Sequence, residues 1–167
     1  NEDGRQLHIM ANYIARTGLA KVYTPDLRGY GLEPKRRGDV DYIGQLTDDL
    51  AALVKLIKKR HTVRRLLVGG HCAGAGTAIK FAASSYGRQA DGYILLAPMV
   101  GIGAWTERKH EAAGAVAAIS IPRLVALTVF NALRLRLFNG LKVVRYNKPA
   151  TMLDALQTTE WSYRLTA

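Results

Sequence analysis

The chain contains one cysteine among its 167 residues, Cys72. A single cysteine excludes a disulfide within the chain and any zinc site built on several cysteines, so the thiol is free. No uncharged apolar run is long enough to cross a bilayer, and no segment has the basic-then-apolar pattern of a signal peptide. We therefore expect a cytoplasmic protein, with peripheral attachment to a membrane as the alternative. Because the chain starts at Asn1 without Met, we also expect both ends to continue in a longer protein.

Acidic residues are scarce. The chain has 13 Asp and Glu against 24 Lys and Arg, which gives a formal net charge of +11. Such a charge attracts anionic surfaces. The basic residues are spread along the chain, however, and neither a nucleic-acid-binding motif nor interleaved aromatic residues accompany them, so no nucleic-acid partner is expected. The simpler interpretation is that the basic residues lie on solvated helix faces. The alternative is that they bind an anionic lipid surface.

The hydrophobic pattern predicts helices that alternate with short strands. Apolar residues at helical spacing indicate helices, and compact apolar runs bounded by Gly or Pro indicate strands. In chain order the expected elements are a helix over 7–14 stopped by Gly18, a strand over 20–24, a loop over 26–38, a helix capped by Asp39 or Asp41 that ends near His61, a strand over 65–69, a helix over 73–86, and a strand over 91–97. This order predicts an α/β protein with a parallel sheet flanked by helices.

The turn Gly70-His71-Cys72-Ala73-Gly74 lies between a predicted buried strand and a predicted helix. A nucleophile on such a sharp turn stands clear of the sheet, provided that its neighbours are small. We expect a side chain at Gly70 or Gly74 to collide with the adjacent strand or helix. The helix N-terminus favours a thiolate at Cys72, and the N–H of Ala73 is placed to donate to an oxyanion.

The turn could also have a purely structural role. His71 is expected to be a structural turn residue, and a lone cysteine is often a small core residue. The turn also lacks the Lys-Ser/Thr of a phosphate-binding loop, so nucleotide binding is not favoured.

Four segments together resemble one branch of the α/β-hydrolase superfamily, that of serine aminopeptidases, monoglyceride lipases and lysophospholipases. They are Pro25-Asp26-Leu27-Arg28-Gly29-Tyr30-Gly31, Asp49-Leu50, Gly69-Gly70-His71-Cys72-Ala73-Gly74-Ala75-Gly76 and Leu95-Leu96-Ala97-Pro98. The resemblance implies a partial α/β-hydrolase fold. It also implies that Asp26, Arg28, Gly29 and Gly31 shape a loop over the active site, and that Gly76 belongs to the nucleophile turn.

The resemblance implies a hydrolase that attacks an ester or related acyl carbonyl, and we expect an acyl-ester hydrolase that needs no cofactor or metal. Its substrate stays open: a monoacylglycerol, a lysophospholipid, a small ester or a peptide-like amide would each suit this branch. The family has Ser at position 72, and this chain has Cys, which the related dienelactone hydrolases also use. The family's acid and His come from later strands, so we expect them beyond residue 167 and expect this fragment alone to be inactive. The alternative is a catalytically inactive hydrolase-like protein that serves in binding or assembly.

The last third of the chain occupies the place where this family inserts a cap, so we divide the chain into a partial hydrolase core over 1–100 and a helical cap over 101–167. Residues 119–138 are apolar on most faces, are broken by Arg123, Arg134 and Arg136, and include no acidic residue. As a cap this segment would line an acyl pocket, which is the favoured interpretation. As an interfacial helix it would rest on anionic lipid.

Overall fold

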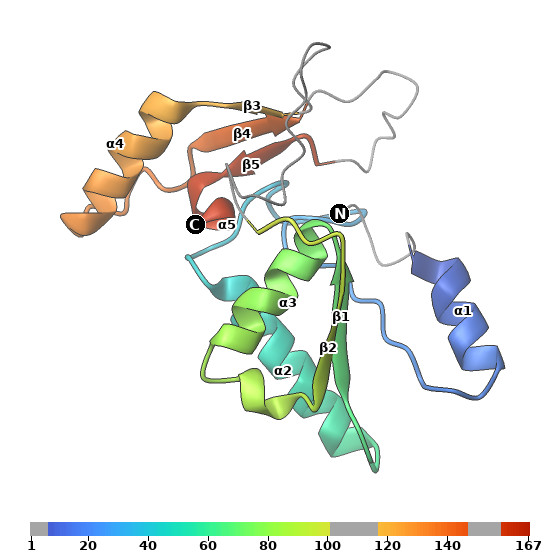
Figure 1. Cartoon of the computed structure of the whole chain (residues 1–167). Helices are drawn as coiled ribbons and strands as arrows, with labels where there is room; N and C mark the ends of the chain where they lie inside the picture. Colours follow the sequence, from blue (N-terminus) through green and yellow to red (C-terminus); the bar gives the residue numbers. More distant parts are fainter. Residues whose placement is uncertain (1–6, 101–116, 147–157) are drawn as a thin grey trace. The chain divides into compact units, whose positions relative to one another are not determined.

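The computed structural model describes residues 7–100, 117–146 and 158–167, and the chain forms two compact units (Figure 1). Residues 42–113 make one unit, which we call the elbow unit. Residues 1–41 together with 114–167 make the other, which we call the loop unit. Among the described residues, no helix combines the length and the apolar character needed to span a bilayer.

The elbow unit is a strand–helix–strand arrangement with a further helix. Its elements are α2 (Gln45–Arg60), β1 (Leu67–His71), α3 (Ala73–Ala83), the 3-10 helix η2 (Gly87–Gln89) and β2 (Gly92–Leu96). β1 and β2 pair in parallel, with Leu67 opposite Gly92 and His71 opposite Leu96. α3 lies against both strands and α2 lies against α3 (Figure 1). The predicted α/β arrangement with a parallel sheet is therefore confirmed.

Apolar residues from alanine to phenylalanine fill the space between α2, α3 and the strands. The buried cluster consists of Ala51, Val54, Leu66, Val68, Ala78 and Phe81. Phe81 is fully buried, and its ring lies near those of Tyr86 and Tyr93. At the start of β1 the Leu66 N–H donates to the Asp91 carboxylate over 2.7 Å, which fixes the register of the two strands.

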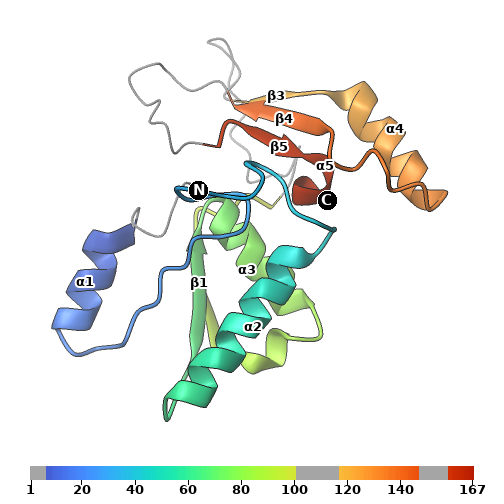
Figure 2. The ribbon, with the colours of Figure 1, turned by 180° about the vertical axis from the view of Figure 1, so that it is seen from behind.

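The loop unit contains an antiparallel sheet with the strand order β3 (Ala117–Ile119), β4 (Lys142–Tyr146) and β5 (Glu160–Ser162) (Figure 2). Its helices are α1 (His8–Arg16), α4 (Ile121–Ala132) and α5 (Tyr163–Thr166). The ring of Trp161 on β5 packs edge-on against Tyr30 and Tyr146, with ring centroids 6.3 and 4.7 Å away. The residue 26–41 loop is thus part of the core of this unit. Whether residues 101–167 act as a cap stays a prediction.

Most of the predicted helices and strands are present, with shifted ends. α1 matches the predicted first helix, and Gly18 follows it with a φ of 72°. β1 begins two residues later than predicted. α3 ends at Ala83, before the predicted 86, because the chain turns there into η2.

The predicted strand over 20–24 is wrong. These residues are exposed and lie in no strand. The apolar run over 20–24 is short. A strand also needs a second strand that pairs with its backbone groups, and the local sequence does not specify whether one will be there.

The predicted cap of the second helix is also wrong. α2 begins after Gly44, which has a φ of 93°, and not at Asp39 or Asp41. Asp39 is instead buried in the loop unit, where an arginine neutralises its charge.

Candidate functional site

Cys72 stands at the junction between β1 and α3, as the sequence predicts. It directly follows His71, the last residue of the strand, and precedes Ala73, the first residue of the helix. Its backbone has a φ of 54° and a ψ of −117°, a conformation that residues with a side chain rarely adopt. Such strain persists only where the surrounding structure imposes it, and it is concentrated at functional sites.

Three backbone hydrogen bonds hold Cys72 in this conformation. Its N–H donates to the carbonyl oxygen of Leu96 at the end of β2, over 3.0 Å. Its own carbonyl oxygen accepts from the N–H groups of Gly76 and Met99, each over 3.1 Å. The end of β2 and the residues that follow it therefore fix the turn from one side, while α3 fixes it from the other.

Gly70 makes the turn possible by its lack of a side chain. A Cβ at this position would lie within 2.5 Å of the Gly74 and Ala75 backbone at the start of α3. Gly76 has a similar role, because a Cβ there would collide with the carbonyl oxygen of Met99.

Gly74 is a correction to the sequence prediction. A Cβ at Gly74 would meet no described atom within 4 Å, so the expected collision does not occur there. The close approach is made by the backbone of Gly74 toward Gly70, and a side chain on Gly74 would point away from that contact.

The surroundings of the thiol combine partial exposure with the start of a helix. Cys72 is partly exposed and is not in a disulfide. The first N–H groups of α3 have no acceptor within the helix, and the helix dipole places partial positive charge at this end. Ala73 is the first residue of α3, so its N–H is one of these groups. His71, on the other side of Cys72, is exposed at the end of β1. The arrangement suits a developing negative charge at or beside residue 72.

The four loop-motif residues lie together in the loop unit. The N–H of Tyr30 donates to the carbonyl oxygen of Leu27 over 2.9 Å and closes a tight turn. Gly31 has a φ of 81°, and a Cβ there would lie 2.8 Å from the Asp26 carboxylate. The motif therefore specifies a turn in which the first residue folds against the last.

The other two motif residues extend the turn toward the rest of the unit. Gly29 accepts hydrogen bonds at its carbonyl oxygen from the Gly38 N–H and from the Thr158 hydroxyl. The Arg28 guanidinium lies 3.9 Å from the Asp41 carboxylate in an exposed ion pair. The motif residues thus connect the loop both to its own later part and to the chain near β5.

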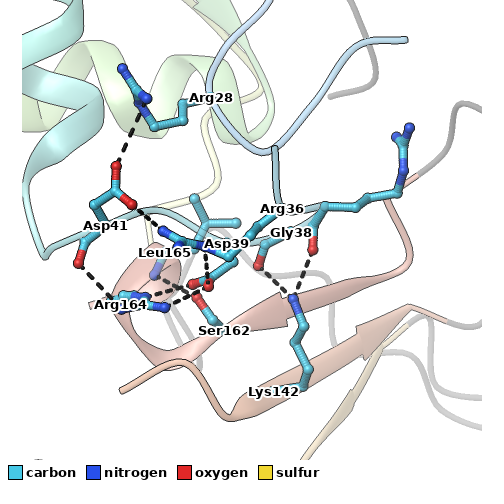
Figure 3. Close-up of polar contacts among 10 residues, drawn as sticks. Arg28, Arg36, Gly38, Asp39, Asp41, Lys142, Ser162, Arg164 and Leu165 are labelled. Carbon is cyan, nitrogen blue, oxygen red and sulfur yellow. Dashed lines mark hydrogen bonds and ion pairs between the residues drawn. The ribbon is translucent and has the colours of Figure 1, made fainter. Parts of the chain in front are cut away.

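A buried ion pair holds the second half of this loop, and the sequence did not reveal it. Arg164 on α5 donates two hydrogen bonds to Asp39, from Nε to Oδ1 over 2.7 Å and from Nη2 to Oδ2 over 2.6 Å (Figure 3). The Nε of Arg36 lies 3.1 Å from the same carboxylate, and Arg36 also pairs with Asp41. Only 8% of the Asp39 side chain is exposed. The bidentate geometry and the burial of Asp39 favour a strong ion pair.

Backbone contacts reinforce the same junction. The Lys142 ammonium donates to the carbonyl oxygens of Arg37 and Gly38 over 2.8 and 3.0 Å, and the Ser162 N–H also donates to that of Gly38 (Figure 3). A Cβ on Gly38 would overlap the carbonyl oxygen of Glu160, so only glycine fits. In the sequence, the only sign of this ion pair was the cluster of charged residues over 35–41. It did not indicate that Asp39 would pair with Arg164, which lies 125 residues later in the chain.

The charge pairing shifts the titration of Asp39. Burial alone would raise the pKa of its carboxyl group, but hydrogen bonds from Arg164 and Ser162 and the charge of Arg164 bring that pKa to about 2. The same carboxylate raises the pKa of Arg164. Asp39 is therefore ionised at any pH at which the protein would ordinarily work.

A family model described as serine aminopeptidase, S33, matches residues 1–159. The match includes both the Cys72 turn and the residue 26–31 motif, whereas Arg164 lies beyond it. No curated protein is significantly similar to the chain in sequence.

The contrast between Gly70 and Gly74 can be tested by one substitution at each position. We expect Gly70→Ala to lower the free energy of unfolding by about 2 kcal/mol, because its Cβ has no room. Gly74→Ala should change it by less than about 1 kcal/mol, and toward greater stability, since alanine favours a helix and open space surrounds the position. Urea unfolding followed by circular dichroism measures both. Equal destabilisation by the two substitutions would show that the turn is not limited by the Gly70 approach.

The Asp39–Arg164 pair predicts a specific acid dependence. Asp39 has a lower pKa in the folded chain than the value near 3.9 typical of an unfolded one, so its contribution is complete above about pH 4 and is lost as the pH falls toward 2. We expect Asp39→Asn to reduce the free energy of unfolding at pH 7 by about 2 kcal/mol and to have a much smaller effect near pH 2, where about half of the Asp39 carboxyl groups are protonated in the folded chain. Urea unfolding monitored by tryptophan fluorescence reports on this unit once Trp105, the other tryptophan of the chain, is replaced by Phe, because Trp161 lies in the core of the unit. Glu33→Gln, an exposed carboxylate on the same loop, is the matched control, and a similar loss there would refute the assignment.

Proposed function

The chain belongs to the serine aminopeptidase S33 family and is a hydrolase with a partial α/β-hydrolase fold, and on this basis we propose that it hydrolyses acyl esters with Cys72 as the nucleophile. The observation that carries the proposal is the conformation of Cys72. A residue with a side chain is held at positive φ on a strand-to-helix turn, where a glycine would be free of strain. In a turn with a purely structural role, glycine at this position would avoid the strain, and a thiol there would add no stability.

The proposed reaction has two steps. The Cys72 thiolate attacks the carbonyl carbon of the ester, and the alcohol leaves with a proton, so that the acyl group is carried as a thioester on Sγ. Water then attacks the thioester carbonyl, which releases the carboxylic acid and restores the thiol. A thiol is partly ionised near neutral pH and needs less help from a general base than the hydroxyl of the serine that the family ordinarily carries here.

The start of α3 supplies the electrostatic part of the mechanism. In each step a negative charge develops on the carbonyl oxygen, and a backbone N–H aimed at that oxygen lowers the barrier. We assign this role to the N–H of Ala73, because it is the first residue of the helix and adjoins the nucleophile. Gly70 and Gly76 hold the turn in place and do not take part in the chemistry.

The substrate class that we propose is a small acyl ester or a lipid ester, and the mechanism needs no cofactor. The family name denotes an aminopeptidase, but a thioester intermediate forms more readily from an ester, because an alkoxide leaves more easily than an amide nitrogen that has not been protonated. A protein that kept the turn but lost the chemistry would serve only in binding, and the experiment below separates the two.

The proposal predicts an acyl adduct on Cys72. We expect p-nitrophenyl butyrate to transfer its acyl group to the chain, and intact-mass spectrometry with peptide mapping to locate the group on Cys72. Because the folded turn activates the thiol, the native chain should react at least about tenfold faster than the same chain unfolded in urea at the same pH. The unfolded chain is a matched control, since it holds the same single thiol without the turn.

Two variants complete the test. Cys72→Ala should form no adduct, and Cys72→Ser should retain the fold while its acylation becomes much slower unless a general base is present. If the native chain reacts no faster than the unfolded one, the thiol is not activated. In that case the protein is a hydrolase-like binding protein and the catalytic assignment fails.

A further inference from the structure

The outward face of α4 has a composition that a helix surrounded by water does not ordinarily show. Along an α-helix successive residues are rotated by about 100°, so one side of α4 is formed by residues that share a direction. That side consists of Ile121, Pro122, Val125, Ala126, Val129 and Ala132, all of which are apolar and exposed. A surface helix normally carries polar residues on its outward side.

The inward side of α4 is already occupied by the loop unit. Leu127 is almost completely buried, the Thr128 hydroxyl accepts a hydrogen bond from that of Tyr163, and Asn131 and Asn139 exchange two amide hydrogen bonds of 2.6 and 2.9 Å. These contacts fix the rotation of the helix. The apolar outward face therefore cannot turn inward without breaking them.

The chain after α4 continues the exposed apolar surface. Leu133, Leu135, Leu137 and Phe138 are each more than half exposed, and Leu137 reaches 90%. Arg134 has a φ of 64°, which ends the helix and turns the following residues outward. We call the α4 outward face together with residues 133–138 the α4 patch. It extends over a helix of about 18 Å and the segment that follows it.

The charged residues within the patch and next to it in sequence are all positive. Arg134 and Arg136 alternate with the exposed leucines, Arg123 lies near the beginning of the helix, and no Asp or Glu occurs anywhere in residues 112–153. An apolar surface bordered by arginines is complementary to a bilayer with anionic headgroups, because the apolar side chains enter the acyl boundary while the guanidinium groups stay among the phosphates.

We infer that the α4 patch binds the surface of an anionic lipid bilayer. A second copy of the chain fits the patch less well. In a symmetric dimer the same face meets itself, so Arg134 and Arg136 would oppose the arginines of the other copy with no acidic residue of this segment to neutralise them. The inference does not depend on Cys72 and would hold for a protein without activity.

Flotation of the full chain with lipid vesicles tests the inference. We expect binding to phosphatidylcholine vesicles that contain phosphatidylglycerol to be at least about tenfold stronger than binding to phosphatidylcholine alone, and to weaken as salt is raised. Leu133→Asp combined with Leu137→Asp should abolish it, because both side chains are well exposed and neither change disturbs the core. Ile9→Asp combined with Leu19→Asp is the matched control, since these apolar residues are equally exposed but lie in and after α1.

A second pair of variants separates the patch from the general positive charge of the chain. Arg134→Gln with Arg136→Gln should lower binding to anionic vesicles several-fold, whereas Lys58→Gln with Lys59→Gln at the end of α2 removes the same charge and should have a smaller effect. Equal effects of the two pairs, equal binding to both kinds of vesicle, or binding that survives the Leu133 and Leu137 changes would each overturn the inference. So would an oligomer, seen by sedimentation without lipid, that those leucine changes dissociate, because the occupant would then be a second copy.

Discussion

The start of α3 approaches the end of β1 so closely that only a hydrogen atom fits on Gly70 in front of the Gly74 and Ala75 backbone. This approach forces the chain to reverse within one residue, and that residue, Cys72, takes a left-handed conformation. The hydrogen bond from its N–H to Leu96 then ties the turn to the neighbouring strand. The position of the thiol, its partial exposure and the direction of the helix dipole all follow from this single steric constraint.

The loop unit depends on a different kind of interaction. Its motif loop is tied to β5 and α5 by Asp39 and Arg164, whose opposite charges are brought together from positions 125 residues apart. The Lys142 ammonium and the Ser162 N–H both donate to the carbonyl oxygen of Gly38, the residue next to Asp39. Because charge pairing can be titrated and steric fit cannot, this unit should respond to acid while the Cys72 turn does not.

The α4 segment shows how much the meaning of an apolar sequence depends on its surroundings. The sequence favoured a packed cap for residues 119–138, because leucine-rich helices are usually buried. In the structure only one side of α4 is buried, at Leu127, while Val125 and Val129 remain exposed. Part of the segment that suggested a cap is therefore exposed, and the arginines that follow α4 are the reason that we propose an anionic bilayer as its binding partner.

The sequence by itself determined the features whose partners are close along the chain. The turn from β1 to α3 and the position of Cys72 in it depend largely on residues that are close along the chain, so spacing and residue size were sufficient to predict them. For residues 26–31 the resemblance implied only that they shape a loop. Only the tertiary structure decided that residues 20–24 form no strand, that β3, β4 and β5 form a sheet, and that Arg164 neutralises Asp39. Strand pairing and buried charge pairing join segments that are far apart in the chain. A local sequence pattern does not specify which distant segment a strand or a charged residue will pair with.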